Sequence, residues 1–559
     1  MAKVSYLGKL IGISLWAVSV FVLTNGTDPV NAPKFFLIGV FSCAALGAIH
    51  FPHFRRIFIN FRFPIVLIVL FNVFSIFSVL ASKAPVSQSL YGVYGRNNGY
   101  FLYLFLSLIF IASLFLSKKE DFRAIIYALL AAGVVNVVYA LWVLSFGDFI
   151  PWNNPYGNLL GTFGNPNFAG SFFGILSAVP MSFLVKRNTS SIHKLGSFVF
   201  LVLIFIGIIE THAVQGKVLF VFSVIFIGFF AIRERSANNF VQFGYLGVSS
   251  LLGFFSVLGA LQIGPLTQII YKESVSLRGQ YWYAGWKTGI SHPIFGVGFD
   301  SYGDWYRFSR KATALIRPGI DTVSNTAHNV FMDVFSFGGF PLLIIYLAIN
   351  LYILTIVINY FRNSRISDPI FVALSTAWLS YQLQSLISIN QIGLAVWGWA
   401  LGASLIAYSK ALSEPTSNSQ FNLKKGRKST FGSVITPSLR STLAGAIGLV
   451  IAIPPLSSDI NWKKALDSRD VIKIENALVS SYFNPLSTQR YNSAVALFET
   501  NSLKDLAYKY ALLGVKYNPN SYEAWKNLYQ IEKSDDMDRQ RALRKMRQLD
   551  PKNPNLKAN

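Results

Sequence analysis

Two stretches of the sequence combine residue types that can do chemistry. RGQYWYAGWKTGISHPIFGVGFDSYG begins at Arg278, and NTAHNVFMDVFSFGGFPLL contains His328. A guanidinium presents a planar fork of donors and stays charged at any relevant pH, so it suits phosphate oxygens better than a lysine does. A neutral imidazole, whose usual pKa lies near working pH, can accept a proton from a hydroxyl. We predict a site that depends on these two side chains.

Each of these residues also has a structural interpretation. Arg278 can pair with Asp300 or Asp304, or with a lipid headgroup. His328 precedes an asparagine and can serve as a capping or hydrogen-bonding residue. Trp282, like the other aromatic residues of this segment, can anchor the chain at a membrane surface or stack against a sugar.

Three further residues are candidates for substrate binding. Arg96 lies in YGVYGRNNGY with glycine nearby on both sides, which favours either a phosphate contact or a turn. Asn165 and Asn167 lie in GTFGNPNFAG, where a helix is predicted to begin. Backbone amides at a helix N-terminus favour anions, while the equally good alternative is a turn followed by a helix cap.

The composition indicates that lipid is the main solvent of this chain. Of its 559 residues, 53% are hydrophobic and only 13% are charged, which excludes an ordinary soluble domain. A spanning helix needs roughly 20 mostly apolar residues. We predict an all-helical, polytopic membrane protein with about thirteen spans. They lie near 7–24, 35–51, 63–82, 100–117, 122–146, 168–185, 195–212, 218–232, 240–263, 339–360, 369–387, 390–408 and 441–457.

Lysine and arginine set the predicted orientation, because basic short loops stay in the cytoplasm. Alternate loops are basic, and they contain Arg55, Arg56, Arg62, Lys118, Lys119, Arg123, Lys186, Arg187, Lys194, Arg233, Arg235, Arg362 and Arg365. This bias predicts a cytoplasmic N-terminus and, with an odd number of spans, an extracytoplasmic C-terminal tail. The net charge of +24 then needs no nucleic-acid partner, because anionic lipid is sufficient. Cys43, the single cysteine, excludes an intramolecular disulfide.

Three segments interrupt the pattern of short connections. The stretch 264–338 is a long outer loop, and loops of this length are usually functional. Residues 411–440 form a Ser-, Asn- and Lys-rich segment that we interpret as a cytoplasmic linker before the last span, 441–457. The tail, 458–559, has prolines at 485, 519 and 551, spaced by 34 and 32 residues, and Trp525 at a predicted core position. This spacing resembles that of tetratricopeptide repeats, which favours a short helical-repeat domain.

The motifs of the outer loop resemble those of the O-antigen ligase and O-antigen polymerase superfamily of bacterial envelope glycosyltransferases. The resemblance covers about residues 1–410 and includes the loop 161–170, the number of spans and the long outer loop. Its most specific parts are a His-Asn pair followed by Gly-Gly, Arg-x3-Trp at Arg278 and Trp282, Arg-x10-Gly at Gly289, and Pro-x2-Gly-x-Gly at Pro293, Gly296 and Gly298.

The resemblance implies an enzyme of the bacterial cytoplasmic membrane that transfers a glycan from undecaprenyl diphosphate to a hydroxyl on the outer face. Arg278 would hold the diphosphate and His328 would activate the acceptor. It implies neither metal nor other cofactor, and the first outer loop has only Asp28 where metal-dependent lipid glycosyltransferases carry a carboxylate pair. The acceptor stays open among lipid A core, polysaccharide, protein and wall polymer, and the tail would bind an envelope partner or a glycan acceptor.

One position departs from the superfamily. Its ligases carry an arginine at the start of a span in the middle of the chain, and here ETHAVQGKVLF has Gln215 in that place. Lys217 could supply the missing charge or extend to the membrane surface. Because of this departure, an inactive membrane scaffold with a partner-binding tail remains an alternative function. A lipid or polysaccharide transporter is the other alternative, although it would predict ionisable residues within the spans, which are almost free of them.

Overall fold

The computed structural model describes residues 3–49, 58–151, 154, 157–187, 189–236, 238–270, 273–364, 368–413 and 436–556. Within these ranges the chain is helical and forms no strand, apart from one isolated bridge between Ser481 and Asn484. This confirms the predicted all-helical class. Most of the predicted linker, 411–440, lies outside the described residues, as do Arg55, Arg56 and Arg365.

Nine of the described helices are long and apolar enough to cross a membrane. They are α4 (Arg62–Ala81), α7 (Lys119–Phe146), α8 (Pro166–Val185), α9 (Ser191–Glu210), α10 (Val214–Arg235), α11 (Asn239–Ala260), α16 (Val330–Asn363), α18 (Ile392–Ser413) and α19 (Pro437–Ser468). The other four predicted spans coincide with shorter helices, namely α1 (Tyr6–Val20), α2 (Asn31–Gly47), α6 (Tyr100–Leu114) and α17 (Pro369–Ser385). A multi-pass membrane protein is therefore supported, while the count of thirteen stays a prediction.

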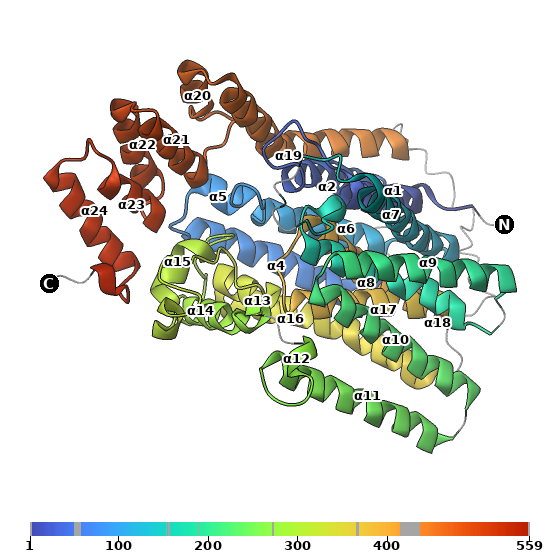
Figure 1. The fold of residues 1–559 in the computed structure, drawn as a ribbon. Coiled ribbons are helices and arrows are strands. Elements are labelled where there is room, and N and C mark those ends of the chain that lie inside the picture. Colours follow the sequence, from blue (N-terminus) through green and yellow to red (C-terminus); the bar gives the residue numbers. More distant parts are fainter. Residues whose placement is uncertain are drawn as a thin grey trace.

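The bundle packs around α18, which is almost entirely buried, whereas α11 stands at the edge with its apolar side chains exposed (Figure 1). Exposed apolar side chains are expected where a helix faces lipid. Close approach between helices depends on small residues. A Cβ at Gly448 of α19 would lie 2.2 Å from the carbonyl oxygen of Gly39 in α2, so this contact excludes any larger residue.

The predicted outer loop, 264–338, folds into short helices at one end of the bundle (Figure 1). These helices are α12 (Thr267–Ile270), α13 (Glu273–Ser276), α14 (Arg278–Ser291), α15 (Tyr302–Ser309) and the 3-10 turn η2 (Ala312–Leu315). The loop ends at Val330, where α16 begins, nine residues before the predicted span at 339. Two helical turns therefore separate the predicted span from the loop.

The glycine-rich motifs of this loop are explained by a direct contact between them. Gly338 and Gly339 kink α16, and Gly339 has a positive φ of 66°. A Cβ at Gly339 would lie 2.3 Å from the carbonyl oxygen of Pro293. The backbone of the Pro-x2-Gly-x-Gly turn bonds across the kink, because Val297 N–H donates to the Ser336 carbonyl at 2.9 Å. These motif residues therefore fix α14 against the first turns of α16.

The C-terminal tail folds around a hydrophobic core of its own, which contains Trp525 at 2% exposure, as predicted. α19 runs without a break from the predicted last span into this tail. Helical hairpins are present where the proline spacing predicts them, while a tetratricopeptide-like repeat stays a prediction. The tail helices are α20 (Val471–Ala477), α21 (Thr488–Thr500), α22 (Lys504–Tyr517), α23 (Tyr522–Gln530), α24 (Asp536–Leu549) and η3 (Pro554–Leu556).

Buried ion pairs attach the tail to the outer segment. Asp550, just after α24, accepts from Arg310 at 2.6 Å and from Arg307 at 3.4 Å. The side chains of Asp550 and Arg310 are both 0% exposed. The tail thus lies at the same end of the bundle as α14 and α15, beside the short helix α5 (Val86–Tyr91) (Figure 1).

We predict that Asp550→Asn releases the tail from the outer segment. Removing one partner of a buried pair leaves an uncompensated charge and costs about 3–5 kcal/mol. Hydrogen exchange should become faster in α24 and α15, and the midpoint of thermal unfolding should fall. The matched control is Glu532→Gln in the exposed Lys504 pair, where the loss should be about 0–1 kcal/mol. Equal effects of the two substitutions would contradict a tail held by buried charge.

Candidate functional site

Arg278 begins α14 and is buried, with 7% of its surface exposed. It faces Gln215 at the start of α10. With the amide oxygen of Gln215 toward the guanidinium, that oxygen accepts from both terminal nitrogens of Arg278, at 3.0 and 3.2 Å. The amide nitrogen then donates to the Asn167 carbonyl at 3.2 Å and to Ser171 Oγ at 2.9 Å, so the surrounding partners select this orientation.

No carboxylate among the described residues forms an ion pair with Arg278. Burial lowers the pKa of Arg278 to about 10, which still leaves the guanidinium charged at neutral pH. Asp300 and Asp304, the partners suggested by the sequence, form their contacts with other residues. A buried cation held only by a neutral amide favours an anionic ligand.

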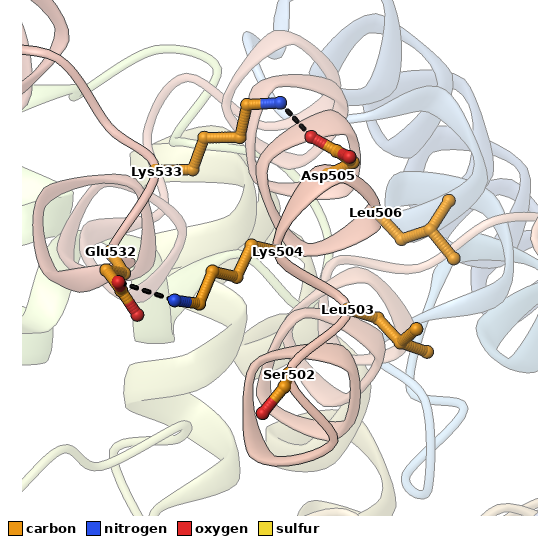
Figure 2. Close-up of a pocket in the computed structure, with 7 residues that line it drawn as sticks. All are labelled: Ser502, Leu503, Lys504, Asp505, Leu506, Glu532 and Lys533. Atoms are coloured by element: carbon orange, nitrogen blue, oxygen red, sulfur yellow. Dashed lines mark hydrogen bonds and ion pairs between the residues drawn. The ribbon is translucent and has the colours of Figure 1, made fainter.

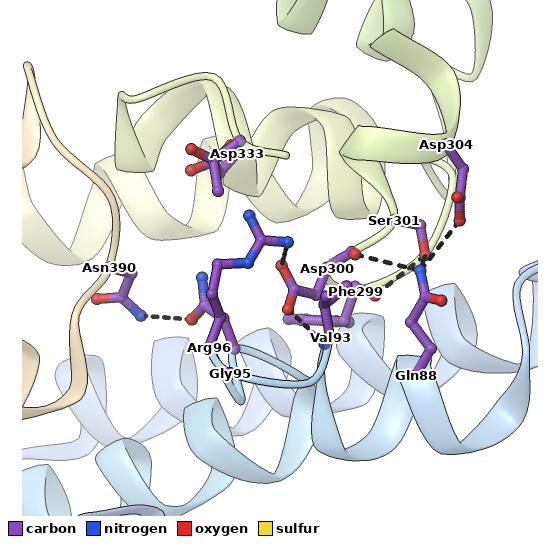
Figure 3. Close-up of polar contacts among 12 residues, drawn as sticks. Gln88, Val93, Gly95, Arg96, Phe299, Asp300, Ser301, Asp304, Asp333 and Asn390 are labelled. Atoms are coloured by element: carbon purple, nitrogen blue, oxygen red, sulfur yellow. Dashed lines mark hydrogen bonds and ion pairs between the residues drawn. The ribbon is translucent and has the colours of Figure 1, made fainter. Parts of the chain in front are cut away.

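Arg96 lies in the turn between α5 and α6 and forms an ion pair with Asp300 at 2.8 Å. Asp300 also accepts from Val93 N–H at 2.6 Å. Burial raises the pKa of Asp300, and the charge of Arg96 opposes that rise. Figure 3 shows the Arg96 side chain reaching from the α5–α6 turn toward Asp300, with Asp333 on the opposite ribbon. Much of the charge of Arg96 is therefore balanced before any ligand binds.

Hydrogen bonds join the region around Asp300 to α5 and to the tail, and Figure 3 shows the side chain of Gln88 on α5 reaching Asp300 and Asp304. The amide of Gln88 donates to the Asp300 carbonyl at 3.3 Å and to Asp304 at 3.1 Å. Asn518, in the tail, donates to the same carboxylate of Asp304 at 3.2 Å. Burial raises the pKa of Asp304, and the bonds from Asn518 and Gln88 oppose that rise. The tail thus contacts Asp304, which is linked through Gln88 to Asp300, the partner of Arg96.

His328 occupies the left-handed region, with φ at 51°, immediately before α16. Asn329, its neighbour, caps the helix by accepting from Phe331 and Met332 N–H. The imidazole lies 5.5 Å from the ring of Tyr281, which comes one turn after Arg278 on α14. Non-glycine residues in this region cluster at functional sites, because the surrounding structure must enforce a strained backbone.

The charge state of His328 differs from the sequence-based expectation of a pKa near working pH. Burial, followed by the charges of Arg278 and Arg96, lowers the pKa of His328 to about 4. The imidazole is therefore neutral at neutral pH and can accept a proton. Tyr281, which contacts this ring, lies one turn from Arg278 on α14, so the two candidate residues belong to the same region of the outer segment.

The other predicted residues do not all join this cluster. Trp282 lies one turn after Arg278 and is exposed. Lys217 is exposed as well, and it follows Gln215 by two residues, which turns it to the opposite face of α10. Asn165 caps α8 by accepting from Asn167 N–H at 2.9 Å. The carbonyl of Asn165 accepts from Ala169 N–H, so the amides at this helix start are largely used within the helix.

Lys34 is a buried residue of α2 that the sequence analysis did not single out. It is 0% exposed, donates to the Ser19 carbonyl at 2.7 Å and lies 4.4 Å from the ring of Phe163. Thr162 donates to the same carbonyl at 2.9 Å. Lys34 therefore holds the 3-10 turn η1 (Gly161–Phe163), which leads into α8. In the sequence, the only indication of this role is that Lys34 stands at the edge of an apolar run.

A surface depression of about 590 Å³ on the tail does not share this chemistry (Figure 2). Its charges are paired across the depression, Lys504 with Glu532 at 2.5 Å and Lys533 with Asp505. These exposed pairs leave no net charge for an ionic ligand, and none of the predicted site residues lines it.

Residues 198–347 match the family described as O-antigen ligase. The match supports a relation of this segment to the O-antigen ligase superfamily. A comparison with curated proteins finds no match. The matched segment contains Gln215, Arg278 and His328, and it ends just after the kink of α16. The superfamily implies glycosyl transfer at a membrane, with a lipid-linked glycan donor and a glycan acceptor in general.

We predict that Gln215→Glu stabilises the protein. Arg278 is already desolvated, so a carboxylate at this place gives it a charge-assisted partner, and hydrogen bonds to charged groups contribute about 1.5–3 kcal/mol. The midpoint of thermal unfolding in detergent should rise. Gln215→Leu is the control and should lower the midpoint, because it leaves the guanidinium without an acceptor. A lower midpoint for Gln215→Glu would contradict an unneutralised Arg278.

Proposed function

We propose that this protein transfers a glycan from undecaprenyl diphosphate to an acceptor hydroxyl on the outer face of the cytoplasmic membrane. The observation that carries the proposal is the buried Arg278, which has no carboxylate partner among the described residues and lies near a neutral histidine. A glycosyl diphosphate needs charge neutralisation on its leaving group, and the attacking hydroxyl needs a base. The match to O-antigen ligases supports the reaction class.

Arg278 holds the diphosphate in this mechanism. Its fork of donors binds two phosphate oxygens at once, which a lysine cannot reproduce. Gln215 accepts from both terminal nitrogens and orients the guanidinium without neutralising it, so the diphosphate binds the remaining N–H groups. Arg96 adds a smaller positive field, because Asp300 already balances much of its charge. Lys217 and Trp282, on exposed surfaces, are left for contacts with lipid or glycan.

His328 takes the proton of the acceptor hydroxyl. As the acceptor oxygen forms its bond with the anomeric carbon, the bond between that carbon and the diphosphate oxygen breaks. The proton passes to the imidazole, and undecaprenyl diphosphate leaves with the electron pair against Arg278. The imidazole gains one positive charge as the leaving diphosphate gains one negative charge, so the step balances without a metal ion or a cofactor. Lipid A core, polysaccharide, protein and wall polymer all supply such a hydroxyl.

In the proposed orientation, the site lies on the extracytoplasmic side of the membrane. Gln215 lies in the first turn of α10, and Arg235 ends the helix 20 residues later, which separates the site from that basic end by about 30 Å. Lys119, which begins α7, pairs with Asp368 at the start of α17. Basic helix ends of this kind favour the cytoplasm. The tail and the segment 264–338 share the opposite end, so we place both outside.

We predict that His328→Ala lowers glycan transfer by about 10²–10⁴-fold, the usual loss for a positioned base. Arg278→Lys should also lose nearly all transfer, because a point charge cannot replace the bidentate contact. The assay measures transfer of labelled glycan from undecaprenyl diphosphate by purified protein in EDTA. In His328→Ala, donor binding should persist.

Matched controls are His193→Ala and Arg544→Lys, which change the same residue types at exposed positions. Both should keep wild-type transfer. Full activity in the His328 and Arg278 variants would refute the site. An inactive wild-type protein with every acceptor class would favour the scaffold alternative.

We predict that bound donor shifts the pH dependence of the base. In the free enzyme, burial and the two arginines hold the pKa of His328 at about 4. A diphosphate on Arg278 offsets part of that positive field, so the imidazole binds its proton more readily and its pKa rises. Activity is lost when the imidazole is protonated. The acid limb of kcat, which reports the complex, should therefore lie at higher pH than that of kcat/KM, which reports the free enzyme. Coincident limbs near pH 6.5 would contradict this account.

A further inference from the structure

A groove of about 690 Å³ runs between α5 and the tail, on the side of α5 that faces away from the Asp300 network. Its lining combines four tyrosines and three serines with several apolar residues and one lysine. Among the described residues that line it, none is acidic. They are Pro85, Val86, Ser87, Leu90, Tyr91, Ser480, Ser481, Tyr482, Pro485, Leu486, Tyr491, Leu513, Lys516 and Tyr517.

Hydrogen bonds hold the polar part of this groove in place. Ser87 Oγ and Tyr517 Oη lie 2.5 Å apart, and they lie 3.0 and 2.7 Å from the Leu486 carbonyl oxygen, so one hydroxyl donates to the other and the second donates to the carbonyl. The ring of Tyr491 packs 5.5 Å from that of Tyr517. On the outer side, Tyr482 is 51% exposed and donates to the Val450 carbonyl of α19. The groove is thus preformed, with one aromatic face accessible at its edge.

The helix α5 separates the groove from the candidate site and contacts both. Ser87 and Tyr91 line the groove, whereas Gln88 reaches Asp300 and Asp304. A cavity of about 30 Å³ shares Ser87, Tyr91, Pro485 and Leu486 with the groove and extends to Asn97, the neighbour of Arg96. It has room for a water molecule.

Asn97 and Arg490 supply unused hydrogen-bonding capacity in that cavity. Asn97 is 4% exposed, and its Oδ1 has no partner among the described residues. Arg490 is 2% exposed, and its Nε is likewise without one. Both residues line the small cavity. Buried polar atoms of this kind require an explanation, and an ordered water or a ligand hydroxyl is one.

We propose that this groove binds a saccharide segment of the glycan that the enzyme transfers or extends. Tyrosine offers an apolar ring face and a hydroxyl at low entropic cost, which suits a ligand whose rings are apolar on one face and hydroxyl-bearing at the edge. Lys516, with no acidic residue in the lining, favours neutral or acidic sugars. A polyprenyl chain would cover the ammonium group of Lys516 without offering it a partner, which is unfavourable.

This inference rests on the proposed function and assigns the tail a part in it. A polymer bound in the groove runs beside α5, a short distance along the chain from Arg96. The tail then forms half of a glycan subsite that also keeps Asn518 against Asp304. Such a subsite raises the local concentration of the chain near the reacting end without taking part in the chemical step.

The test measures binding of glycan that lacks the lipid diphosphate. Short fragments of the source cell's own lipid-linked glycan, released by mild acid, are added to the purified full-length protein in detergent, and saturation-transfer NMR gives the affinity. Tyr482→Ala should weaken binding at least about five-fold, the range for losing an anchoring aromatic contact. Tyr482→Phe should retain most of the affinity. Tyr529→Ala, on the exposed face of α23 outside the groove, should leave it unchanged.

These outcomes test glycan binding in the groove separately from glycan transfer. No binding to the wild type, or equal binding to Tyr482→Ala with an unchanged unfolding midpoint, overturns the inference. Displacement of the glycan by undecaprenol alone would show that the groove takes lipid, and overturns it as well. Arg278→Lys should bind the fragments normally while losing transfer. If the wild type binds the fragments but transfers nothing, the proposed function fails and the groove stands.

Discussion

The interaction on which the site depends is the contact between Arg278 and Gln215. A buried guanidinium is costly unless polar groups surround it, and a carboxylate partner would satisfy it so well that no anionic substrate could compete. The protein uses a neutral amide instead, held by Ser171 and the Asn167 carbonyl at the start of α8. Asp300 and Asp304, the two acidic residues that the sequence suggested as partners, contact other residues, Asp300 with Arg96 and Asp304 with Gln88 and Asn518. Several elements are thus arranged so that one charge remains available.

The same arrangement explains the departure at position 215. An arginine there, as in the superfamily's ligases, would place a second cation beside Arg278, and the two would need an anion between them to be stable. Glutamine removes that requirement but contributes no charge. Under the proposed function, a bound diphosphate then contacts fewer cations, and Arg278 is its main partner, with Arg96 acting through a field that Asp300 reduces.

The sequence predicted the helices and motifs that carry the site residues, but it did not predict which side chains contact one another. Apolar runs predict helices because lipid requires internal backbone bonding, and every predicted span coincides with a described helix. The motifs singled out Arg278 and His328, but their spacing carried no information on which carboxylate pairs with which arginine. Those contacts join residues about 200 positions apart, as between Arg96 and Asp300. Lys34 was missed for the same reason, because its burial depends on Ser19 and Phe163, which approach it only in the folded bundle.

The tail was predicted as a helical unit that binds an envelope partner or a glycan acceptor, and its buried contact with the outer segment was not predicted. Its docking residues are polar, so amphipathic patterns in the tail reveal its core around Trp525 and leave the docking face looking like ordinary surface. In the structure this face is buried against the outer segment and is not ordinary surface. Arg307 and Arg310 come from the outer segment and are buried only because Asp550 covers them, and such charges would be solvated if the tail moved away. A tail that merely recruits partners gains nothing from sealing two arginines, whereas a tail that forms one wall of a groove beside α5 must keep a fixed position. The buried charges therefore favour a tail that works as a permanent wall of the substrate-binding region.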